Sequence, residues 1–167
     1  EALAMVTACL PVYRTYRSGT RVADGDRDLA LIDEAFAHAQ ANAPAVDPHI
    51  FRSLRQWLAS DASDPETQDF MARWEQMAPA VMAKGAEDTT FYLYDRLVSC
   101  NEVGAQPWAL GISGEHFHEF CHRLHRTWPD NLLATSTHDT KRSEDVRARI
   151  SVLTEIPSKW AEAVRGW

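Results

Sequence analysis

Several features that would assign this chain of 167 residues to a familiar class are missing. Its cysteines (Cys9, Cys100 and Cys121) are odd in number and far apart, which indicates neither a disulfide framework nor a CxxC metal knuckle. We expect them to be reduced and buried. No apolar run approaches the roughly 20 residues of a membrane-spanning helix, and no signal-peptide pattern opens the chain. The sequence therefore predicts a soluble, cytoplasmic protein with no membrane partner.

Blocks of positive charge are also missing. Lys and Arg number 17 against 24 Asp and Glu, so the formal net charge is −7. Because phosphate backbones are bound by concentrated positive charge, we expect no nucleic-acid partner. The nucleotide-binding patterns GxGxxG and GxxxxGK[ST] and the hydrolase pattern GxSxG do not occur, which leaves those chemistries without support.

What the sequence does contain is enough apolar material for a core. The hydrophobic fraction is 45% and there are six Trp residues, which excludes wholesale disorder. The length suits one domain, or one domain with a fragment of another. The chain enters an apolar run directly after Glu1 and has no initiator Met, so we expect a piece of a longer protein.

Helical patterns dominate the middle of the chain. Residues 6–16 are rich in β-branched and aromatic types and predict an extended segment, and a polar loop is expected around Gly19 and Asp24. Apolar residues then recur at helical spacing, with Asp-Pro pairs as start signals and Pro79 as an expected kink or split. The predicted helices cover residues 28–39, 87–97 and 113–126, and two further helices are predicted to begin at residues 48 and 65.

A strand, a polar turn and a helix are predicted near the end of the chain. Residues 131–137 form a short apolar run bounded by Pro129, which reads as a buried strand, and Ser143 is a candidate N-cap for the helix that follows. Pro157 should close that helix, and residues 158–167 begin another. The predicted fold is therefore mainly α, with two short strands and one βα unit.

The turn in that βα unit is the first candidate site. Polar groups crowded at the carboxyl end of a buried strand are typical of ligand clefts in barrels and open α/β sheets. Asp139 offers a carboxylate to neighbouring hydroxyls, His138 a ring N–H and Lys141 a positive charge. An alternative stays open at this point, in which Asp139 only caps the helix and Lys141 is merely solvated.

Two weaker candidates lie on predicted helices earlier in the chain. Lys84, Tyr92 and nearby acids have the composition of a sugar site, although an ordinary capped helix with aromatic core contacts explains the same pattern. His118, His122 and His125 share one helix face, with His116 nearby, and two imidazoles at i, i+4 can bind a metal. No acid or thiol at ligand spacing completes that set, so we expect no metal and no cofactor.

Four sequence blocks resemble one enzyme family. The chain is similar to maltooligosyl trehalose synthases, members of the α-amylase family, over nearly its whole length and in the family's order. The blocks are TACLPVYRTY (7–16), AKGAEDTTFY (83–92), RLVSCNEVG (96–104) and LATSTHDTKRSEDVR (133–147).

The resemblance implies an intramolecular transglucosylase, which turns the reducing-end α-1,4 linkage of a maltooligosaccharide into an α,α-1,1 linkage. It implies a (β/α)₈ barrel with helical insertions. By this match residues 1–20 are a barrel strand segment, residues 21–129 are a helical insertion module, and residues 130–167 carry a barrel strand, the catalytic-motif turn and the following helices.

The resemblance also implies roles for single residues. Asp139 is the transition-state-stabilising carboxylate and His138 bonds a hydroxyl of the transferred sugar. Lys84, Lys141, Tyr92 and Arg142 are the other expected substrate-binding residues. The nucleophile and the acid/base of this family lie on earlier barrel strands, so we expect them upstream of Glu1 and expect the isolated chain to be inactive.

Two other functions remain open on the sequence. A plain α-amylase-type hydrolase shares the His138-Asp139 pair, and a helical interaction or metal-binding module would use the histidine-bearing helix. The expected partners under the main interpretation are a maltooligosaccharide and the rest of the same polypeptide's barrel.

Overall fold

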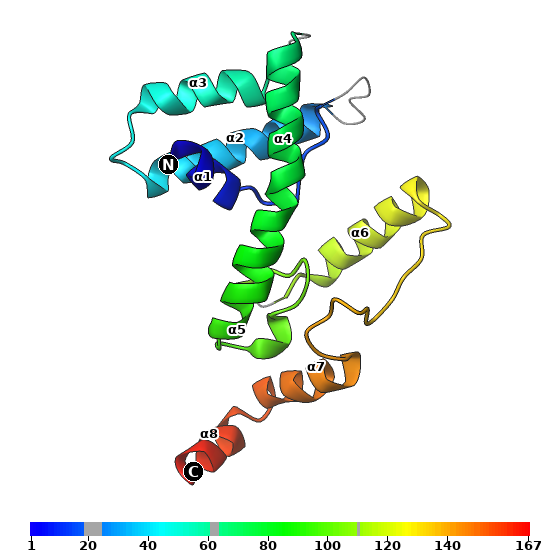
Figure 1. Cartoon of the computed structure of the whole chain (residues 1–167). Coiled ribbons are helices and arrows are strands. Elements are labelled where there is room, and N and C mark those ends of the chain that lie inside the picture. Colours follow the sequence, from blue (N-terminus) through cyan, green and yellow to red (C-terminus); the bar gives the residue numbers. More distant parts are fainter. Residues whose placement is uncertain (19–24, 61–63, 110) are drawn as a thin grey trace. The chain divides into compact units, whose positions relative to one another are not determined.

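The computed structural model describes residues 1–18, 25–60, 64–109 and 111–167, and the predicted loop around Gly19 and Asp24 lies outside these residues. The described part is helical and contains no strand (Figure 1). None of its helices is both long and apolar enough to cross a bilayer. The chain divides into two compact units, Glu1–Asp88 and Thr89–Trp167.

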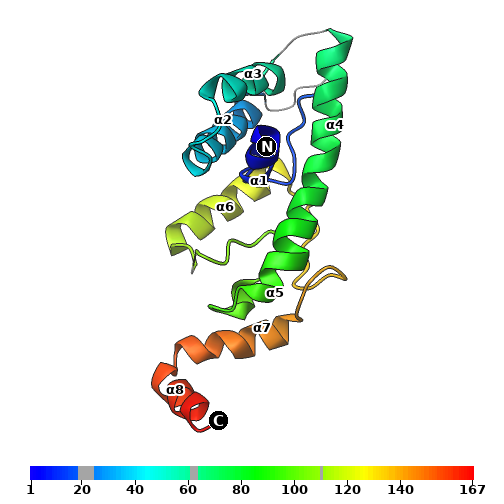
Figure 2. The same ribbon diagram turned by 60° about the vertical axis from the view of Figure 1, so that its left-hand side comes forward.

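Four helices build the first unit. They are α1 (Ala2–Ala8), α2 (Gly25–Asn42), α3 (Pro48–Leu58) and α4 (Pro65–Val81). Both ribbon views place α1 beside α2 and α3, and α1 also contacts α4 (Figures 1 and 2). The buried side chains Val6, Ile32, Phe51 and Met71 meet in one core. This helical module agrees with the helical part of the predicted fold.

The expected start signals of α3 and α4 are confirmed. The carboxylate of Asp47 accepts a hydrogen bond from the backbone N–H of His49 (2.8 Å), and that of Asp64 accepts one from the N–H of Thr67 (2.9 Å). In both helices Pro occupies the first position, where its missing N–H costs nothing. Two of the first orphan N–H groups are thereby satisfied.

The prediction of a strand in residues 6–16 is wrong. α1 covers Ala2–Ala8, because this segment is rich in Ala, Leu and Met, which are good helix formers. The residues after it are anchored by side chains instead of a ladder. Buried Glu75 accepts hydrogen bonds from Thr15 Oγ1 (2.8 Å), from the N–H of Arg17 (2.6 Å) and from the N–H of Ser18 (3.2 Å). A buried carboxylate holds the segment that we expected a sheet to hold.

Pro79 does not split α4. The helix continues to Val81, and its hydrogen-bond pattern widens to a π-helix over Met82–Thr90, followed by the short α5 (Phe91–Leu93). Gly85 lies inside this π-helix. The predicted helix over 87–97 therefore ends early, at Leu93.

The second unit carries α5, α6 (Gly114–Thr127), α7 (Glu144–Ser151) and α8 (Pro157–Arg165), with 3₁₀ turns at Val98–Cys100 and Val152–Thr154. The helix predicted over residues 113–126 is formed, and Ser113 is its N-cap, whose hydroxyl accepts a hydrogen bond from the N–H of His116 (3.2 Å). Residues 131–137 are irregular, so the predicted strand and βα unit are not formed. A strand needs a hydrogen-bonded neighbour, and no part of the described chain provides one.

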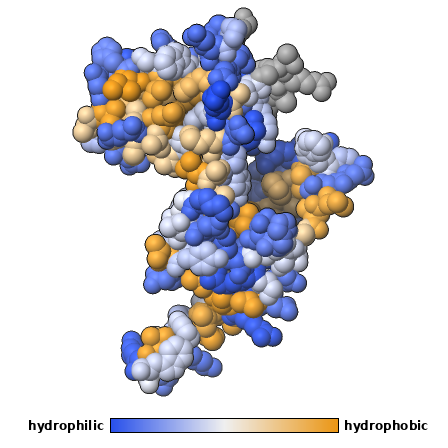
Figure 3. All heavy atoms as spheres, viewed as in Figure 1, coloured by the Kyte–Doolittle hydropathy of each residue, from blue (hydrophilic) through white to orange (hydrophobic). Residues whose placement is uncertain are grey.

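Large apolar side chains are exposed in the second unit. No residue of α6, α7 or α8 is buried, and Leu132 is 95% exposed. Figure 3 shows hydrophobic residues on the visible surface of the molecule. The cysteines also differ from the expectation of full burial, since Cys9 and Cys100 are half-buried and Cys121 is exposed.

Candidate functional site

The turn Thr137–Thr140 presents the predicted site residues His138 and Asp139 to solvent. The backbone N–H of Thr140 donates to the carbonyl of Thr137 (3.2 Å), and the Thr140 hydroxyl donates to the same carbonyl (2.7 Å). The side chains of His138 and Asp139 are 92% and 68% exposed, with 3.4 Å between Nε2 and Oδ2. Both are therefore open to a ligand.

Asp139 does not cap α7. Ser143 is the N-cap residue of that helix, and the N–H of Asp139 is itself held by the hydroxyl of Thr137 (3.3 Å). The interpretation of Asp139 as a helix cap is therefore not supported. Its carboxylate remains available for chemistry.

The amino-terminal side of the turn is tied to α7. The carbonyl of Thr135 accepts a hydrogen bond from Arg147 Nη2, and the hydroxyl of Ser136 pairs with the carboxylate of Glu144. The N–H of Glu144 donates back to the Ser136 hydroxyl (3.1 Å). The hydrogen bond from Ser136, helped by the backbone N–H and by Arg147, lowers the pKa of Glu144 below its usual range. Glu144 thus stays ionised at neutral pH.

The carboxyl-terminal side of the turn is tied to the loop after α5. Glu102 accepts hydrogen bonds from the backbone N–H of Lys141 (2.5 Å) and of Arg142 (3.2 Å). The guanidinium of Arg142 donates to the carbonyl of Val98 (3.3 Å). Arg142 therefore contributes to the anchoring of the turn.

Tyr92 and Lys141 come together in the same unit. The ammonium of Lys141 lies 5.5 Å from the centroid of the Tyr92 ring, within the range of a cation–π contact. Tyr92 is 65% exposed, so it is not the core aromatic of an ordinary capped helix. An exposed ring beside an ammonium is a suitable surface for a sugar.

Lys84 lies in the first unit, Glu1–Asp88. Its ammonium forms an exposed ion pair with Asp88 (2.6 Å), one helical turn away. The structure thus brings five of the six predicted site residues into one unit, and Lys84 is the exception.

Sequence reasoning missed Asn101 and Glu102. Asn101 is fully buried, and its Nδ2 donates to the carbonyls of Phe91 (3.0 Å) and Tyr94, which closes the chain after α5. Glu102 is only 7% exposed. The signal in the sequence that could have pointed to these two residues is an amide and an acid side by side, shortly before Gly104. In the structure, Gly104 has a φ of 72°. That signal marks a structured loop.

The histidine-bearing helix shows no metal site. His116, His118, His122 and His125 are all exposed on α6. Within the described residues no group of three or more His, Cys, Asp or Glu side chains could hold a metal ion.

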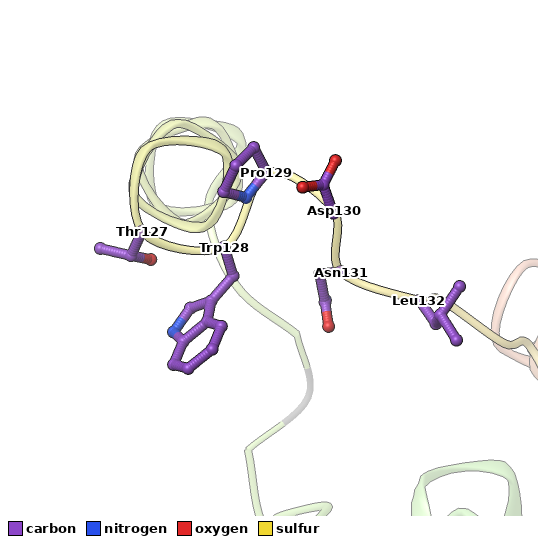
Figure 4. A pocket seen from close by; sticks show the side chains of 6 residues that line it. All are labelled: Thr127, Trp128, Pro129, Asp130, Asn131 and Leu132. Carbon is purple, nitrogen blue, oxygen red and sulfur yellow. The ribbon is translucent and has the colours of Figure 1, made fainter.

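A shallow concavity of about 410 Å³ lies beyond the end of α6 and is lined by residues 127–132. Figure 4 shows Trp128 and Asn131 pointing to one side of the chain and Asp130 to the other. None of the predicted site residues lines this concavity. It is separate from the His138-Asp139 turn along the chain.

Comparisons with known proteins show that this chain is similar to part of longer proteins. No family model matches it. Two curated proteins from strains of Mycobacterium tuberculosis, each called "Putative maltooligosyl trehalose synthase", are 48% identical over 135 residues, which is 81% of this chain and 17% of theirs. The chain therefore spans about 17% of the length of these relatives.

Solved structures give the same result. The maltooligosyltrehalose synthase of Arthrobacter ramosus superposes with a TM-score of 0.77 at 39% identity, covering 95% of this chain and 19% of that one. A hypothetical maltooligosyl trehalose synthase of Sulfolobus tokodaii gives 0.69 at 38% identity, covering 99% and 20%. The chain is thus similar to one mainly helical segment of these much longer proteins. They are named maltooligosyl trehalose synthases, and the resemblance carried by the four sequence blocks is confirmed.

Proposed function

We propose that this chain works as an internal segment of a maltooligosyl trehalose synthase. The whole enzyme would convert the reducing-end α-1,4 linkage of a maltooligosaccharide into an α,α-1,1 linkage by intramolecular transglucosylation, as a step of trehalose biosynthesis in the cytoplasm. The observation that carries this proposal is the likeness to the Arthrobacter ramosus enzyme over 95% of the chain. The reaction uses no cofactor in this proposal.

Asp139 is the proposed transition-state stabiliser. Retaining glycosyl transfer uses a nucleophilic carboxylate and an acid about 5–5.5 Å apart around an oxocarbenium-like transition state. A third carboxylate can bond sugar hydroxyls whose hydrogen bonds strengthen as positive charge develops. The exposure of Asp139 and His138 on an anchored turn supports this role. The nucleophile and the acid/base would come from the rest of the polypeptide, so the isolated chain is expected to be inactive.

The unformed strand has a place in the same proposal. Residues 131–137 would pair with neighbouring barrel strands in the whole enzyme, because a parallel strand is stable only between covered neighbours. Residues 130–167 would then adjoin the barrel, and the helical module would lie outside it. Exposed apolar side chains such as Leu132 and Leu133 would be covered by this pairing.

Isomerisation requires that the released glucose stay in place until it attacks the intermediate. We assign this retention to Lys84, Lys141, Tyr92 and Arg142, whose charges and ring suit hydroxyls and pyranose faces. The contact of Lys141 with the Tyr92 ring supports a shared sugar-binding surface for these two residues.

Product analysis tests the proposed function. The full-length protein that carries this segment should convert maltopentaose into a non-reducing product. Free glucose and maltose as the main products would favour the α-amylase-type hydrolase instead. Trehalose-type product from the purified 167-residue chain would contradict the assignment of the nucleophile and the acid/base to other segments.

A further inference from the structure

Glu102 is a buried acid whose two carboxylate oxygens are both used by the main chain of the neighbouring loop. Oε1 accepts from the N–H of Lys141 (2.5 Å), and Oε2 accepts from the N–H of Arg142 (3.2 Å). Two consecutive backbone N–H groups that point at one carboxylate form an anion-binding concavity. Hydrogen bonds to an ionised acceptor are stronger than neutral ones, so this contact is a firm anchor.

The anchored segment is held by polar contacts on both sides. Residues 137–140 are exposed or half-exposed, so the turn has no buried apolar side chain to fix its orientation. Its amino-terminal side is held through Ser136 and Thr135 by α7. Its carboxyl-terminal side is held by the pair of hydrogen bonds to Glu102, together with the bond from Arg142 to Val98. The direction of the turn therefore depends on polar contacts.

We propose that Glu102 is a positioning residue for the Asp139 turn. By fixing the main chain at Lys141 and Arg142, it sets where the carboxylate of Asp139 and the ammonium of Lys141 are presented. The inference rests on the proposed function, because it matters for catalysis only if Asp139 acts on the sugar. Glu102 itself acts through the backbone and not on the substrate.

Three variants of the full-length protein separate positioning from mere stability. Glu102→Gln keeps the shape but turns one acceptor into an N–H donor that faces a backbone N–H. Glu102→Asp keeps the charge and both acceptors at a shorter reach. Met71→Ala removes a core side chain that is 1% exposed in the other unit and serves as the control for destabilisation alone.

Amide hydrogen exchange is the first measurement, and it can be made whether or not the enzyme is active. In Glu102→Gln the backbone amide hydrogens of the peptide that contains Lys141 and Arg142 should exchange about 10-fold faster or more. The reason is that each of the two amides loses its hydrogen bond to a charged acceptor, or keeps it only in a poorer geometry. The rest of the protein should exchange as in the wild type. Unchanged exchange at these two amides would overturn the proposal, whatever the enzyme makes.

Steady-state kinetics with maltopentaose is the second readout. We expect kcat of Glu102→Gln to fall about 10- to 100-fold with a smaller change in KM, since displaced catalytic groups cost rate at the chemical step. Glu102→Asp should retain more activity than Glu102→Gln. The reverse order, or a loss no larger than that of Met71→Ala, would overturn the positioning role. A wild-type enzyme that forms no non-reducing product would contradict the proposed function instead, and the exchange result would still decide whether Glu102 holds the turn.

Discussion

Among single residues, Lys84 is the predicted site residue that belongs to the first unit. Its ammonium forms an exposed ion pair with Asp88 at i, i+4. Exposed pairs of this kind contribute little to stability, roughly 0.3–0.5 kcal/mol. The loss of this ion pair should therefore have little effect on the free energy of unfolding.

Removing the Lys84 side chain should therefore change products more than stability. In the full-length enzyme we expect Lys84→Ala to raise the ratio of hydrolysis to isomerisation about tenfold, the size of one charge-assisted hydrogen bond to the retained glucose. The matched control is Arg73→Ala, which removes another exposed i, i+4 pair, with Asp69, and should leave the ratio unchanged. An unchanged ratio in Lys84→Ala, measured by chromatography of the products, would remove Lys84 from the acceptor site.

At the scale of the element, the N-cap of α4 gives a pH signature. The hydrogen bonds from the backbone N–H and side chain of Thr67 lower the pKa of Asp64 below its ordinary value of 3.8. Because the folded pKa is the lower one, the stabilisation by the ionised cap is complete above about pH 4 and is lost as the pH falls through the folded pKa.

The variant Asp64→Asn tests the direction of this pH dependence. Asn caps a helix well but carries no charge to meet the helix dipole. The wild-type chain should melt at a higher temperature than Asp64→Asn at about pH 6, and the gap should close at about pH 2 as the carboxylate is protonated. Thermal unfolding followed by circular dichroism measures the two melting temperatures at each pH. A gap that stays constant over this range would show that the charge of Asp64 contributes nothing.

The π-helix gives a second test at this scale. A Cβ at Gly85 would meet no atom within 4 Å, and its φ is not in the left-handed region. Gly85→Ala should therefore raise the free energy of unfolding by about 0.4–1 kcal/mol by restricting the unfolded chain. Ala83→Gly, in the same π-helix, should lower it by roughly 0.5–1 kcal/mol. Urea unfolding that shows a loss for Gly85→Ala would contradict the open space around this position.

The elements also show what the sequence could and could not predict. The Asp-Pro starts of α3 and α4 are local signals, and the structure confirms both of them. The strands were predicted from runs of β-branched and apolar residues. Such a run describes one strand, and it does not show whether a neighbouring strand is present to pair with it. In residues 2–8 helix propensity prevailed, and in 131–137 the described chain has no neighbour to pair with. Glu102 could not be found from its own neighbours, since its role depends on amides 39 and 40 residues away.

At the scale of the whole molecule, the two units differ in how much core they have. The buried apolar side chains lie mostly in the first unit, and those described in the second unit are Phe91 and Pro107. Amide hydrogen exchange of the 167-residue chain should therefore show protection in α1–α4 and weak protection in α6–α8. Equal protection in both sets of helices would contradict this difference. The exposed apolar side chains should also cause concentration-dependent self-association, which sedimentation velocity can detect.

For the whole molecule, we propose that Asp139 belongs to a glycosyl-transferring site that the rest of a longer enzyme completes. The most direct measurement is the rate at which the full-length protein converts maltopentaose into a non-reducing product, compared between the wild type, Asp139→Asn and the control Asp130→Asn, which changes another acid of the same unit. We expect kcat to fall about 10²- to 10³-fold in Asp139→Asn, as for the removal of one group that stabilises transition-state charge, and to stay near the wild-type value in Asp130→Asn. An Asp139→Asn enzyme as active as the Asp130→Asn control would contradict the account.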